Sequence, residues 1–156
     1  FVVNALGEAS VSRLARLYRD GAGGAYLRLL LGIAGLGAAC GLVGLALAWL
    51  AGAPLLRLLY AEDYAAYAGL FGMIMLAAPL RYAAGVLQFG LTAARHFRLQ
   101  FALQAVLVVA TTLMAYPLIG GHGLMGAAYL LIFNAALFLV LVSGAVLWLA
   151  SRCRGM

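Results

Sequence analysis

A row of polar side chains runs through one long apolar part of the sequence. Arg81, Gln88, Thr92 and Arg95 follow one another at intervals of seven, four and three residues. In a helix of about 3.6 residues per turn, these intervals place all four side chains on one face. A guanidinium stays charged at any physiological pH and binds phosphate or carboxylate oxygens in pairs. The row is therefore suited to holding an anionic or polar molecule, and nothing in it needs to make or break a bond.

A second polar row faces the first if the chain turns back on itself. Gln100, Gln104 and Thr111 recur at intervals of four and seven, and Asn134 stands near the middle of the last apolar run. Polar rows on facing helices predict a water-accessible cavity between them. A structural interpretation stays open, in which these amides and hydroxyls form interhelical hydrogen bonds of about 0.6 kcal/mol each. In the same way, Arg81 could pair with a backbone carbonyl, or with a carboxylate in a missing N-terminal half of the protein.

The composition predicts where such helices would lie. The chain has 156 residues, of which 67% are hydrophobic and only 9% are charged. A soluble domain usually carries about a quarter charged residues. The charged residues are clustered between long, continuous apolar runs, whereas a membrane β-barrel would show apolar and polar residues in alternation. The pattern is typical of a polytopic helical membrane protein, whose spanning backbone must satisfy its own hydrogen bonds.

Four runs have the roughly 20 residues needed to cross a bilayer. They lie near residues 29–50, 64–91, 99–119 and 124–150. Residues 7–20 are amphipathic, with arginines opposite an apolar side, which predicts a helix lying in the membrane interface. The predicted fold is therefore all-α, with four transmembrane helices after an N-terminal interfacial helix. The opening FVVNAL looks like the end of an earlier span, so we expect residues 1–156 to be a C-terminal membrane domain fragment.

The arginines predict the orientation of the chain. Eight of them fall on one side of the predicted spans, and Arg57 alone falls on the other. The eight are Arg13, Arg16, Arg19, Arg28, Arg95, Arg98, Arg152 and Arg154. By the positive-inside rule that side and the C-terminus are cytoplasmic. The net charge of +6 is then a topology signal, and no nucleic-acid partner is expected.

Two local motifs have a structural interpretation and a functional one. Gly37 and Gly41 form a GxxxG, which favours close helix packing within the chain, with homodimerisation as the alternative. Glu62 and Asp63 are expected at the N-terminus of the second span, where carboxylates are favoured; a coupling-ion site is the alternative. No Walker, GxGxxG or GxSxG motif occurs, so an ATPase or hydrolase is not expected.

The order of several segments resembles a known family. These segments are RLARLYRDG at 13–21, a Gly-rich span, APLLRLLYAEDYAAYA at 53–68, LTAARHFRLQ at 91–100 and GHGLMGAA at 121–128. Together they resemble the C-terminal part of the O-antigen and capsule polysaccharide flippases of the multidrug/oligosaccharidyl-lipid/polysaccharide exporter superfamily. The resemblance implies a transporter of twelve or more helices in two lobes, with this chain as the last four helices and the missing N-terminal half as its partner.

The resemblance also implies an activity. A flippase of the bacterial cytoplasmic (inner) membrane moves a polyprenyl-diphosphate-linked oligosaccharide across the bilayer by alternating access, for lipopolysaccharide and other cell-surface polysaccharides. The substrate-binding residues would be Arg81, Gln88, Arg95, Gln104 and Asn134. No catalytic residue, cofactor or metal is expected. Two alternatives remain: a drug or metabolite antiporter, which predicts an intramembrane carboxylate that these spans lack, and a non-transport membrane-embedded subunit.

Overall fold

The computed structural model describes the backbone of residues 2–59 and 62–153, and the side chains of 8–59, 63–64 and 66–151. This part of the chain is all-α, as predicted. Its elements are α1 (Val2–Arg19), α2 (Gly23–Leu59), the 3₁₀ helix η1 (Glu62–Tyr67), α3 (Ala68–Ala93) and α4 (Phe97–Cys153). Phe1 and Arg154, which entered the predictions above, lie outside the described residues.

Three of these helices, α2, α3 and α4, are long and apolar enough to cross a membrane. The expected span at 29–50 lies within α2, and most of the span at 64–91 lies within α3. Its first residues instead belong to η1, so Glu62 and Asp63 begin the 3₁₀ helix and do not begin α3. The prediction that this pair begins the second span is therefore wrong by the six residues of η1, about two turns of 3₁₀ helix.

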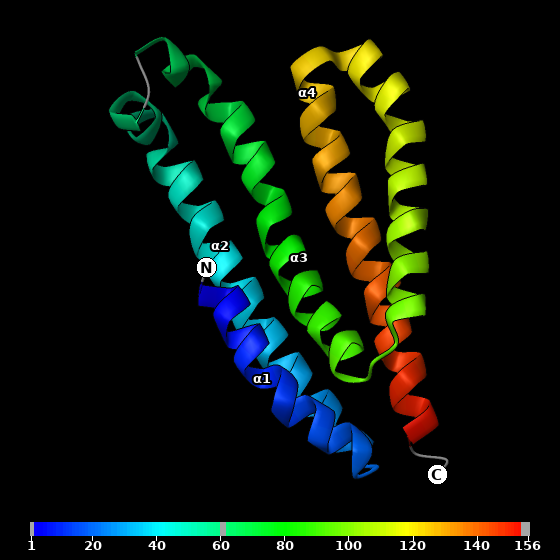
Figure 1. Ribbon diagram of the computed structural model, residues 1–156. Coiled ribbons are helices and arrows are strands. Elements are labelled where there is room, and N and C mark those ends of the chain that lie inside the picture. The colour runs from blue at the N-terminus through cyan, green and yellow to red at the C-terminus, as the bar shows by residue number, and fades with distance from the viewer. Residues whose placement is uncertain (1, 60–61, 154–156) are drawn as a thin grey trace.

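The other two expected spans, 99–119 and 124–150, are the two arms of α4. The arms join at Gly123, whose φ of 56° and ψ of −129° are not helical. Figure 1 shows the arms running back along each other, and a hydrogen bond from Asn134 Nδ2 to Thr111 Oγ1 joins them at 2.7 Å. Glycine is needed at this corner because side-chain-bearing residues rarely adopt such angles. The arms also approach closely at Gly126, whose missing Cβ leaves room for the carbonyl of Leu118.

Helices α2 and α3 pack closely through small residues. Gly37 and Gly41 are both buried, and a Cβ on Gly41 would collide with the backbone of Pro79. This confirms the intrachain contact expected of the GxxxG motif. A Cβ on Gly32, Gly35 or Gly44 would meet nothing within 4 Å, so these glycines do not extend the contact.

Helix α1 lies lengthwise against the lower part of α2, running the opposite way (Figure 1). Leu14 is only 1% exposed, and Val11, Ala15, Leu17 and Tyr18 pack against the same core. Arg13, Arg16 and Arg19 are exposed on the other side. The amphipathic pattern was correctly identified, but the apolar side contacts α2 and α3, whereas an interfacial helix would turn it to lipid.

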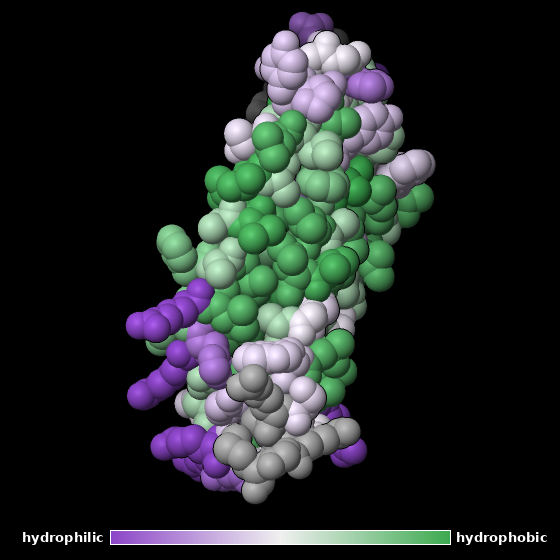
Figure 2. All heavy atoms as spheres, turned by 90° about the vertical axis from the view of Figure 1, so that its right-hand side faces the viewer, coloured by the Kyte–Doolittle hydropathy of each residue, from purple (hydrophilic) through white to green (hydrophobic). Residues whose placement is uncertain are grey.

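The surface agrees with a membrane environment. Figure 2 shows a broad apolar middle with hydrophilic side chains gathered toward the two ends. Large apolar side chains are strongly exposed, among them Leu50 at 85% and Tyr116 at 89%. Apart from the tyrosine Tyr26, no polar or charged side chain among the described residues is buried. Exposed apolar surface of this extent on a long helix is what a hydrocarbon solvent favours.

Candidate functional site

Arg81 lies in the middle of α3 and reaches across to the second arm of α4. Its Nη1 donates a hydrogen bond to Asn134 Oδ1 at 3.3 Å. Its guanidinium carbon lies 4.9 Å from the centre of the Phe138 ring. Asn134 and Phe138 are one helical turn apart, so together they fix the direction of the guanidinium. The Arg81 side chain remains exposed, and among the described residues its other N–H groups have no hydrogen-bond partner.

The hydrogen bonds continue from Asn134 to the first arm of α4. Asn134 Nδ2 donates to Thr111 Oγ1 at 2.7 Å, and the Thr111 hydroxyl donates to the Leu107 carbonyl at 2.7 Å. A guanidinium only donates, so Asn134 must offer its oxygen to Arg81 and its NH₂ to Thr111. This directed chain of hydrogen bonds, from Arg81 through Asn134 to Thr111, is called the Arg81 relay below.

The charge of Arg81 is not balanced by an acidic residue of its own or the neighbouring spans. The sequences of α2, α3 and α4 contain no aspartate and no glutamate. The Phe138 ring and the Asn134 amide offer only partial negative charge. Within α2, α3 and α4 the structure pairs Arg81 with the Asn134 amide, and these helices supply no carboxylate partner. The guanidinium still carries a positive charge for which an anionic ligand is the natural complement.

The two predicted polar rows meet at a second point, near the lower end of α3. Gln100 Nε2 donates to Thr92 Oγ1 at 3.4 Å, and the Thr92 hydroxyl donates to the main-chain oxygen of Gln88 at 3.2 Å. The side chains of Gln88 and Gln104 are half-buried along the same two segments. The rows thus do face each other, as their spacing predicted.

Arg95 departs from its predicted position. Helix α3 ends at Ala93, and Arg95 follows in the left-handed region with φ 57°. It lines a hollow of about 270 Å³ against α1, shared with Tyr18 and Arg19. The prediction placed Arg95 three residues after Thr92 on a continuous helix, but the helix ends before Arg95. Arg95 therefore lies beside α1 and does not share a face of α3 with Arg81.

Sequence reasoning missed an aromatic group that joins the elements at this end of the molecule. The Tyr18 hydroxyl lies 3.3 Å from His96 Nε2. His96 packs edge-on to Tyr18 and to Trp148, with ring centres 6.3 and 6.4 Å apart, and Tyr18 also packs on Tyr26 at 5.9 Å. These residues come from α1, α2, the α3–α4 turn and the end of α4. In the sequence, the one feature that these residues share is that each lies near the end of a predicted span, and this was the only signal that could have predicted their contact.

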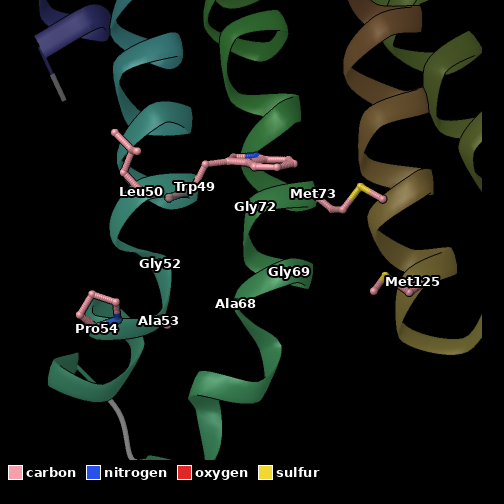
Figure 3. Close-up of a pocket in the computed structure, with 11 residues that line it drawn as sticks. Trp49, Leu50, Gly52, Ala53, Pro54, Ala68, Gly69, Gly72, Met73 and Met125 are labelled. Atoms are coloured by element: carbon pink, nitrogen blue, oxygen red, sulfur yellow. The ribbon is translucent and has the colours of Figure 1, made fainter.

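A larger pocket opens at the opposite end, between α2 and α3 (Figure 3). It has a volume of about 440 Å³ and is lined mainly by apolar and small residues. Trp49 extends from α2 over Gly72, with its indole Nε1 3.2 Å from where a Cβ would stand. Figure 3 shows Met73 of α3 directed toward Met125 of α4. None of the predicted site residues lies in this pocket.

Comparisons with protein-family models, with curated proteins and with solved structures find no match to this chain. The part of the chain that the structure describes is all-α, with three long apolar helices that could cross a membrane, the last of them folded back on itself at Gly123.

Proposed function

We propose that this chain is part of a membrane transporter that flips a polyprenyl-diphosphate-linked oligosaccharide across the bacterial cytoplasmic membrane. The observation that carries the proposal is Arg81, an exposed guanidinium in the middle of an apolar helix that has no acidic residue. An ionisable group at such a depth costs several kcal/mol unless it has a partner or a wet surrounding, and is usually functional.

The chemistry of the Arg81 relay fits a diphosphate. Asn134 holds one end of the guanidinium at 3.3 Å, which orients the group and leaves its remaining N–H groups for phosphate oxygens. Arginine is preferred for such recognition because its planar fork matches a pair of phosphate oxygens. Thr92, Gln100 and the half-buried amides further along the rows offer hydrogen bonds to sugar hydroxyls.

The surface beside Arg81 leaves room for a head group. Gly85 follows one turn later on the same face, and a Cβ there would meet nothing within 4 Å. Ala84, next to it, is fully buried against the neighbouring helices. One side of α3 is therefore packed and the side with Arg81 is open. In a transporter of two lobes this open side would face the cavity, and rocking of the lobes would expose it to each side of the membrane in turn.

Transport of lipid-linked oligosaccharide by Arg81→Ala and Arg81→Lys variants tests the proposal. Loss of a charge-assisted pair costs about 2 kcal/mol or more, so we expect Arg81→Ala to lower transport at least about thirtyfold. Arg81→Lys keeps the charge without the fork and should transport at an intermediate rate. Arg57→Ala is the matched control, because Arg57 is also exposed but lies near the far end of α2. Transport by Arg81→Ala at the wild-type rate, with normal protein level, would refute the role of Arg81.

The access of water to the proposed cavity is tested separately. In a background of Cys40→Ser and Cys153→Ser, Gly85→Cys should react with a water-soluble, membrane-impermeant thiol reagent. Gly144→Cys is the control, because a side chain there also meets nothing within 4 Å but lies on α4 away from the relay. Labelling at Gly144→Cys and not at Gly85→Cys would place the Arg81 face against lipid and remove the cavity.

A further inference from the structure

A groove between α1 and α2 combines two arginines with an apolar trough. The groove has a volume of about 450 Å³. Arg13 of α1 and Arg28 of α2 both line it, beside the apolar residues Leu17, Leu29, Gly32 and Ile33. The α2 residues follow one helical stripe at intervals of three and four, so the trough continues along α2 away from the α1–α2 turn. None of these residues takes part in the Arg81 relay.

The surroundings of the groove are strongly basic. Residues 13–28 contain four arginines and a single acid, Asp20. Arg13, Arg16, Arg19 and Arg28 are all exposed, and Asp20 lies in the turn after α1. Each exposed arginine near an anionic membrane surface contributes about 1 kcal/mol of attraction. A ligand for this place should therefore carry negative charge at one end and an apolar chain at the other.

We propose that the groove binds an anionic phospholipid of the cytoplasmic leaflet. Arg13 and Arg28 would hold the phosphate from two different helices, and an acyl chain would lie along Leu29, Gly32 and Ile33. The trough is open beside Gly32, where a Cβ would meet nothing within 4 Å. A free phosphate ion would engage the guanidinium groups but would leave the apolar trough unfilled, so the lipid matches both halves of the groove.

The position of the groove supports this occupant. Arg28 stands five residues after the start of α2 at Gly23, where the chain passes from its basic end into the apolar part of the helix. The phosphate would lie at head-group depth and the acyl chain in the hydrocarbon, as in the basic pockets that bind anionic lipids elsewhere. A bound lipid would bridge α1 and α2. The inference does not depend on the transported substrate, because it uses a different face of the molecule.

Native mass spectrometry of the full-length protein in detergent, with added phosphatidylglycerol or phosphatidylcholine, tests the charge requirement. Loss of both guanidinium groups in Arg13→Gln/Arg28→Gln should weaken phosphatidylglycerol binding about thirtyfold. The matched control Arg19→Gln/Arg98→Gln removes the same amount of charge from two other exposed arginines at this end of the molecule. Equal loss in the control, or equal binding of phosphatidylcholine by the wild type, would overturn the proposal.

A second variant tests the trough without changing any charge. Gly32→Leu should fill the trough and lower phosphatidylglycerol binding, whereas Gly35→Leu should not. Both glycines are exposed on α2 and open to free space, so neither substitution should affect folding. If inorganic phosphate binds as tightly as phosphatidylglycerol, or if Gly32→Leu binds phosphatidylglycerol like the wild type, the groove is an anion site only and the lipid assignment is wrong.

Discussion

Asn134 Oδ1 accepts a hydrogen bond from Arg81 Nη1 at 3.3 Å, and this contact joins α3 to the second arm of α4. The Asn134 amide also donates to Thr111 Oγ1 at 2.7 Å, so a single side chain links α3 and both arms of α4. The orientation of Arg81 therefore depends on a residue 53 positions away in the sequence. Any movement of the two arms of α4 relative to α3 would change the direction of the guanidinium.

Replacing Asn134 should separate its structural contribution from its effect on Arg81. Asn134→Leu removes two interhelical hydrogen bonds, and at about 0.6 kcal/mol each the free energy of unfolding should fall by about 1 kcal/mol. Asn134→Asp would place a carboxylate beside Arg81; we expect stability to be kept and transport to fall, because the guanidinium is then neutralised. Both quantities can be measured by SDS titration in mixed micelles and by the transport assay.

Ser143→Ala is the control for the two Asn134 variants. Among the described residues, Ser143 Oγ donates a hydrogen bond only to the Leu139 carbonyl of its own helix, at 2.6 Å. Ser143→Ala should leave both quantities near wild type. If Asn134→Asp transports normally, the free positive charge of Arg81 is not required, and the proposed diphosphate contact has no support.

The sequence predicted much of this arrangement, because the long helices follow from apolar run length alone. The corner at Gly123 falls between the expected spans at 99–119 and 124–150, and the facing rows also followed from spacing. The position of Arg95 did not, since helical periodicity applies only as far as Ala93. The packing of α1 was also beyond the pattern, because an amphipathic helix shows the same periodicity whether its apolar side meets lipid or protein. The group around His96 needs contacts between residues as distant as Tyr18 and Trp148.

The contact of α2 with α3 should tolerate no added methyl group at Gly41. A Cβ there would collide with the backbone of Pro79, which cannot move aside as a side chain could. We expect Gly41→Ala to lower the free energy of unfolding by about 1–3 kcal/mol. Gly35→Ala, on the open side of the same helix, should be neutral or slightly stabilising in the same titration. Equal stability of the two variants would mean that α2 and α3 do not pack through Gly41.

The corner of α4 should depend on Gly123 and Gly126 in different ways. Gly123 has φ 56° and ψ −129°, so Gly123→Ala should cost about 1–3 kcal/mol of backbone strain. Gly126→Ala should separate the arms, because its Cβ would collide with the Leu118 carbonyl. Gly120→Ala, where a Cβ meets nothing within 4 Å, is the control. The separation of the arms can be measured by disulfide cross-linking in a Thr111→Cys/Asn134→Cys background. The cross-linked fraction should fall in Gly126→Ala and stay unchanged in Gly120→Ala.

The packing of α1 can be tested through Leu14, which is 1% exposed and contacts the core shared by α2 and α3. Leu14→Ala would leave a cavity that costs about 2–5 kcal/mol when the surroundings cannot close it. Since α1 has fewer contacts than the long helices, we expect this loss to appear as local opening of α1. Hydrogen exchange of the α1 amides in lipid nanodiscs should speed up, while α4 stays protected. Arg16→Ala, on the exposed side of α1, should exchange like the wild type. Unchanged exchange in Leu14→Ala would indicate that the apolar side of α1 rests on lipid, as the sequence pattern alone had predicted.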